Sequence, residues 1–86
     1  MLKIVEQGER EGTRLRLQGD VIGLWVEELR RSCDSARRAG PVTVDLTDVG
    51  FLDWAGVDLL RRLDDDGVRL VNASRFVIEQ LKAQTP

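Results

Sequence analysis

Histidine is absent from the 86-residue sequence, and cysteine occurs once, as Cys33. Without histidine, neither a Ser–His nor a Cys–His catalytic pair can form, and no glycine-rich phosphate-binding motif is present. We therefore expect no enzyme activity, no catalytic residue and no cofactor. A single cysteine cannot form an internal disulfide, which is typical of proteins in a reducing cytoplasm. We expect Cys33 to be a small buried hydrophobic residue.

Long apolar runs are also absent, and none approaches the roughly 20 residues that a membrane-spanning helix needs. The N-terminus lacks the pattern of a signal peptide. With 13 basic and 15 acidic residues, the net charge is −2 and no basic stripe suggests a nucleic-acid partner. We predict a cytoplasmic protein without membrane insertion. Its length predicts one domain, residues 1–86, whose core is too small for a deep substrate cavity.

Hydrophobic periodicity predicts elements in the order β-β-α-β-α-β-α. Alternation of apolar and polar residues predicts strands at 2–7, 13–18, 42–46 and 68–72, the first two of which form a hairpin. Helical spacing predicts helices at 21–39, at 54–63 and after residue 74. Because helices separate the later strands, those strands should pair in parallel. The predicted fold is an α/β domain with a four-stranded mixed sheet and about three helices, more on one face than on the other.

Local signals predict where these elements begin and end. Gly19 and Asp20 should break the second strand, with Asp20 as the N-cap of the first helix. Residues 47–50 should form a polar loop after the third strand. Ser74 is placed to cap the last helix, and residues 84–86 should fray.

A surface site is predicted where the third strand leads to the second helix. Asp53 can cap that helix, because its carboxylate can accept a hydrogen bond from the first turn and meets the positive end of the helix dipole. Trp54 has two equally weighted interpretations: an exposed anchor for a partner protein, or an indole folded into the core. The residues we expect to bind a partner are Thr47, Asp48, Asp53, Trp54, Ala55, Gly56 and Asp58.

Other polar and aromatic residues have weaker functional interpretations. Asp45, Asp48 and Asp53 could gather as a Mg²⁺ or phospho-acceptor site, but caps and turns explain them better, so we predict no metal site. The run of aspartates at 64–66 should be a solvated helix end. Trp25 lies on the apolar stripe of the first helix and should belong to the core.

The stretch VTVDLTDVGFLDWAGVDLL at 42–60 resembles the signature of STAS domains, the module shared by sulfate transporters and anti-sigma factor antagonists. LRLQGDV at 15–21 and GVRLVNAS at 67–74 fit the same family, so the resemblance covers roughly residues 2–82. It implies a mixed sheet packed with helices. It also implies a non-enzymatic protein that docks an anti-sigma factor or similar kinase-like regulator through residues 47–60, in transcription regulation.

The antagonist branch of this family typically carries Asp-Ser-x-Gly at the start of the second helix, and its serine is phosphorylated by the partner kinase. Asp53 and Gly56 match the aspartate and glycine, but Trp54 occupies the serine position. An indole cannot accept a phosphoryl group, so the resemblance implies no phosphorylation at the family position. The nearest hydroxyl upstream is Thr47.

A second branch is similar in having Asp-x-Ala-Gly followed by a leucine-rich helix. It is the STAS subunit of a bacterial phospholipid-transport ABC complex, which binds the ATPase subunit and tends to carry a Leu-Trp pair like Leu24-Trp25. An accessory role in such a complex is therefore the alternative function. Family members usually continue into a further strand or helix, so apolar surface could be open here and a homodimer is a further expectation.

Overall fold

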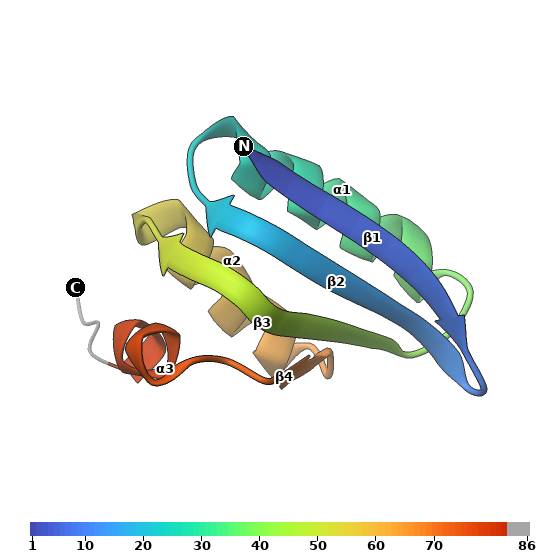
Figure 1. Ribbon diagram of the computed structural model, residues 1–86. Coiled ribbons are helices and arrows are strands. Elements are labelled where there is room, and N and C mark those ends of the chain that lie inside the picture. Colours follow the sequence, from blue (N-terminus) through green and yellow to red (C-terminus); the bar gives the residue numbers. More distant parts are fainter. Residues whose placement is uncertain (83–86) are drawn as a thin grey trace.

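A four-stranded sheet with strand order β1-β2-β3-β4 forms the body of the protein, as seen in the computed structural model, which describes residues 1–82 (Figure 1). The predicted element order is confirmed. The elements are β1 Leu2–Glu9, β2 Gly12–Val21, α1 Leu24–Arg37, β3 Val42–Leu52, α2 Trp54–Asp65, β4 Arg69–Val71 and α3 Arg75–Lys82. The predicted fraying at 84–86 lies outside the described residues.

The sheet is mixed, as predicted. β1 and β2 form an antiparallel hairpin, whereas β2 pairs with β3, and β3 with β4, in parallel. The parallel pairs require crossovers, which α1 and α2 supply. Figure 1 views the sheet from its open face, with α1 and α2 behind it. α3 lies beside the C-terminal half of β3, on the same margin of the sheet as the short β4.

The core lies between the sheet and the two crossover helices. Leu15 and Leu17 of β2 are fully buried, whereas the intervening Arg16 faces the open side. Cys33 of α1 is buried as predicted, and burial raises the pKa of its thiol to about 11. Trp25 is half-buried and packs against the core, in agreement with its predicted position on the apolar stripe.

The prediction of a loop at residues 47–50 is wrong, because β3 continues to Leu52. Two register shifts against β2 each place one extra residue on β3, after Asp45 and after Val49. Each bulge reverses the side to which the following side chains point. The buried residues Leu46, Val49 and Leu52 are therefore three apart, a spacing that hides a strand from a search for strict alternation.

The predicted break at Gly19 and Asp20 is also wrong, since β2 runs on to Val21. α1 consequently begins at Leu24, and its N-cap is Gly23, with φ 58° and no side-chain cap of its own. At the other end of the chain, β4 has three residues rather than five. α2 extends two residues beyond the predicted end at 63, and the aspartates at 64–66 are exposed as predicted.

Candidate functional site

The carboxylate of Asp53 connects the first residues of two helices. Its Oδ1 accepts a hydrogen bond from the backbone N–H of Gly56 at 2.8 Å, which confirms Asp53 as the N-cap of α2. Its Oδ2 accepts from the N–H of Gly23, the N-cap residue of α1, also at 2.8 Å. In addition, the Asp53 N–H donates to the Val21 carbonyl oxygen. Asp53 is thereby fixed to the ends of β2 and α1, and the first turn of α2 after Trp54 is fixed to Asp53.

Gly56 is buried where α2 touches the end of β2. A Cβ atom at this position would lie 2.3 Å from the Val21 carbonyl oxygen, far inside contact distance. The glycine therefore allows the first turn of α2 to approach the β2 backbone closely. Asp53 and Gly56, the two motif residues that match the family pattern, both have a structural task here.

Trp54 extends into solvent, with 66% of its surface exposed. The alternative that its indole fills the core is therefore wrong. Ala55 and Asp58 on the same helix are also exposed, and Asp58 forms an ion pair with Arg62 at 3.2 Å. An exposed tryptophan next to a firmly held backbone leaves a large apolar surface open to a partner.

Thr47 and Asp48 lie on β3 rather than in the predicted loop. The Thr47 hydroxyl donates to Asp45 at 2.6 Å, and Asp48 pairs with Arg16 of β2 at 3.4 Å. These contacts place both residues on the open face of the sheet, before the strand reaches Leu52. The predicted 47–60 stretch is thus divided between this open face and the start of α2.

Asp45 is the buried acidic residue of the described chain, 8% exposed. Burial alone would raise its pKa, but hydrogen bonds from the Thr47 hydroxyl and backbone, from Asn72 and from Arg14 outweigh that effect and lower it to about 2. Asp45 is therefore ionised and internally satisfied at neutral pH.

The three aspartates weighed as a metal or phospho-acceptor site do not form one. Asp45 is paired with Arg14, Asp48 with Arg16, and Asp53 caps the helices. Among residues 1–82, no group of three potential ligands is arranged to hold a metal ion. No helix in that same part of the chain has the length and apolar character needed to cross a membrane.

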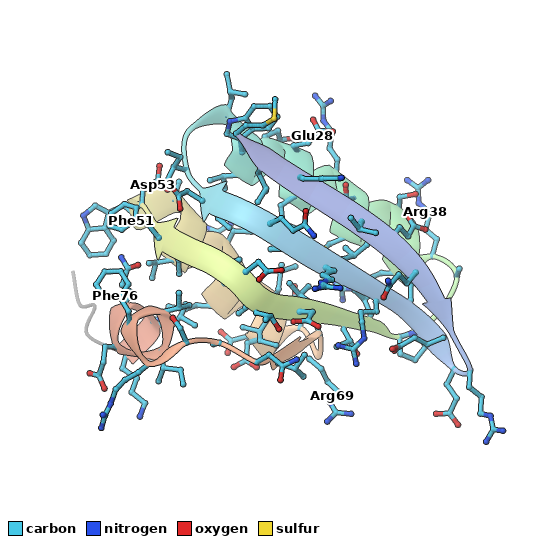
Figure 2. The ribbon with its side chains drawn as sticks, viewed as in Figure 1. Glu28, Arg38, Phe51, Asp53, Arg69 and Phe76 are labelled. Carbon is cyan, nitrogen blue, oxygen red and sulfur yellow. The ribbon has the colours of Figure 1, made fainter. Side chains whose placement is uncertain are left out.

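Sequence reasoning missed the contribution of α3 to this end of the molecule. The Phe51 and Phe76 rings stack with centroids 6.3 Å apart, and both remain about half exposed (Figure 2). The side-chain amide of Gln80 binds the Leu52 backbone twice, accepting from its N–H at 3.0 Å and donating to its carbonyl at 2.8 Å. The sequence signal for an exposed Phe51 was its position next to the apolar Leu52, because neighbouring residues of a strand face opposite sides of the sheet.

We use the name apolar rim for Leu24, Phe51, Trp54 and Phe76. All four side chains are exposed by 45% or more. Their backbones are linked through neighbouring residues. Leu24 follows Gly23, whose N–H donates to Asp53, and Trp54 follows Asp53. Phe51 precedes Leu52 and Asp53 on the same stretch of chain, and its ring stacks on Phe76. The rim holds four of the six large exposed apolar residues of the described chain, one each from the start of α1, the end of β3, the start of α2 and the start of α3.

Comparison with known proteins supports the fold. No protein-family model and no curated protein matches the chain. Among solved structures, the chain is similar to the anti-sigma factor antagonist SpoIIAA in its unphosphorylated form, with 23% sequence identity and a TM-score of 0.62. The match covers 92% of this chain and 82% of SpoIIAA. The predicted resemblance is confirmed at the level of architecture: the chain has the STAS fold seen in an anti-sigma factor antagonist.

Proposed function

We propose that this chain is a non-enzymatic, cytoplasmic interaction module that docks a regulatory protein, of the anti-sigma factor or kinase-like type, through the apolar rim. The observation that carries the proposal is the exposed indole of Trp54 beside the doubly hydrogen-bonded Asp53. The similarity to SpoIIAA, which is an anti-sigma factor antagonist, supports the choice of partner class.

The geometry suits binding because the anchor is presented on rigid backbone. Tryptophan is enriched among binding hot spots, where it buries a large area for the ordering of only two side-chain torsions. Here the backbone before it is fixed by Asp53, and the backbone after it belongs to a regular helix. Binding a partner would therefore cost little free energy for ordering the backbone on which it docks.

Binding through this site would not be switched by phosphorylation at the family position, because Trp54 has no hydroxyl. The nearest hydroxyl residues before and after Trp54 in the sequence, Thr47 and Ser74, already take part in hydrogen bonds of the fold. The hydroxyl of Thr47 donates to Asp45, and that of Ser74 accepts from the Val77 N–H at 3.1 Å as the cap of α3. Binding through this site would thus not depend on phosphorylation of residue 54.

The test is affinity capture from the native cell, followed by mass spectrometry and by measurement of binding to the purified partner. Trp54→Ala should weaken binding at least roughly tenfold, as expected for a central aromatic anchor. Arg10→Ala is the matched control, because residue 10 lies in the β1–β2 turn at the opposite end of the sheet (Figure 1). Equal binding by both variants would refute the proposal.

The alternative partner is the ATPase subunit of a phospholipid-transport ABC complex. The observation favouring it is the Asp-Trp-Ala-Gly sequence, which lacks the phosphorylatable serine, together with the Leu24-Trp25 pair at the start of α1. Neighbouring genes distinguish the two proposals: ATPase and permease genes favour transport, whereas kinase and sigma-factor genes favour transcription regulation. The identity of the captured protein then decides between them.

A further inference from the structure

A second surface lies at the opposite margin of the sheet, along the outer edge of β1. β1 is an edge strand paired on one side only, with β2. Alternate residues of such a strand direct their backbone N–H and C=O groups outward, where an extended chain can pair with them. Eight residues in an unbroken antiparallel register make this edge long and regular.

A shallow groove of about 290 Å³ follows this edge on the side of the sheet that faces α1. Its apolar part is formed by Leu2 and Ile4 of β1 and by the half-buried Trp25 of α1. Its acidic part is formed by Glu6 of β1 and Glu28 of α1, and Figure 2 shows Glu28 on the α1 side of β1. Among the described residues, neither glutamate forms an ion pair, whereas the adjacent Glu27 contacts both Arg30 and Arg31.

We infer that the β1 edge binds an extended segment of another protein. The side chains of that segment that face the groove are apolar or basic, and the residues between them face away from it. In a strand added to β1, every second side chain would point into the groove. An apolar side chain would then cover Ile4 and Trp25, and a lysine or arginine two residues along would meet Glu6 and Glu28. The two unpaired carboxylates set the charge of the occupant.

A second copy of the chain fits this groove poorly. In antiparallel pairing, residues that face each other point to the same side of the sheet. The β1 residues of a second copy on the groove side would be Leu2, Ile4, Glu6 and Gly8, none of which is basic. Lys3 is the one basic residue of β1, and it faces the other side. The charge pattern therefore selects a different, basic partner.

The test uses the full, isotope-labelled chain and two synthetic peptides, Thr-Val-Thr-Val-Thr-Lys-Thr-Lys and its reverse, so that both strand directions are sampled. At least one peptide should shift the amide resonances of β1 and the indole resonance of Trp25. Its affinity should exceed that of the matching peptide with glutamate for lysine by roughly tenfold at low salt, and the difference should shrink as the salt concentration rises.

The double variant Glu6→Lys plus Glu28→Lys should reverse the preference in favour of the glutamate peptide, while a dispersed amide spectrum that changes only near the two substitutions shows that it is folded. Trp54→Ala should bind the lysine peptide as well as the parent chain does, which separates this surface from the apolar rim. The inference is overturned if neither lysine peptide binds, if lysine and glutamate peptides bind equally, or if the shifts lie outside β1 and α1.

Discussion

Asp53 accepts a hydrogen bond from the backbone of Gly23, thirty residues earlier in the chain, and so caps a helix to which it does not belong. Because the same carboxylate also caps α2, one side chain sets the relative placement of the two helix starts. The exposed Leu24 and Trp54 directly follow these two residues, so the arrangement also sets the geometry of the apolar rim.

Replacement of Asp53 should therefore lower the free energy of unfolding more than is usual for a residue that is only partly buried. We expect Asp53→Ala to lower the free energy of unfolding by about 2–3 kcal/mol, since two backbone donors lose their acceptor. Asp53→Asn keeps one acceptor oxygen and should lose about half as much. Urea denaturation measures both, with Asp58→Ala as the exposed control that should change stability by less than about 0.5 kcal/mol. Equal losses for the alanine variants at 53 and 58 would contradict the double cap.

Gly56→Ala should destabilise the fold by about 1–3 kcal/mol, because the added methyl group would be forced against the Val21 carbonyl. Gly8→Ala is the matched control, since a Cβ at residue 8 meets nothing within 4 Å. Thermal unfolding of the two variants should show a clear loss for the first and little change for the second. The idea of a close approach between α2 and β2 fails if both behave alike.

The network around Asp45 should make stability depend on pH. Asp45 has a lowered pKa of about 2 in the folded protein. Its contribution to stability is therefore fully present above the ordinary aspartate pKa near 4, and it is lost as the pH falls through about 2. Asp45→Asn should be about 2 kcal/mol less stable than the parent at pH 7. Denaturation at a series of pH values should show this difference closing between about pH 4 and pH 2. A difference that stays constant over that range would rule out the carboxylate as its source.

Incubation with a cognate anti-sigma factor kinase and ATP should leave the intact mass of the protein unchanged. Trp54 cannot be phosphorylated, and the hydroxyls of Thr47 and Ser74 are engaged in hydrogen bonds. As a positive control, Trp54→Ser restores a hydroxyl at the family position and should gain one phosphate. A gain of mass by the parent chain would show that a switch exists elsewhere.

The element order and the cap at Asp53 could be predicted because each depends on local signals. Alternating residues at 42–46 begin β3, and Asp53 is followed by helical spacing from residue 57. The predicted lengths of β2 and β3 were wrong, because both strands are longer than expected. Pairing with a neighbouring strand continued both elements through residues with weak strand character, and the two bulges removed the alternation that would have revealed it.

The start of α1 was mispredicted for a related reason. Asp20 is a good N-cap by residue type, but it remains in β2, and the cap comes instead from Asp53. No pattern around residue 23 could show this, because the acceptor is distant in sequence. The exposure of Trp54 could not be predicted from the sequence either, since it depends on how α2 packs rather than on the identity of the neighbouring residues.

The pairing of Gln80 with the Leu52 backbone links the last helix of the described chain to the candidate docking surface. If α3 transiently detaches, the Leu52 amide loses its acceptor, and the Phe51 ring loses Phe76 at the same moment. Hydrogen exchange at this one amide thus reports local opening of the C-terminal helix. A bound partner that contacts both phenyl rings would slow hydrogen exchange at the Leu52 amide, although the partner would not touch that amide directly.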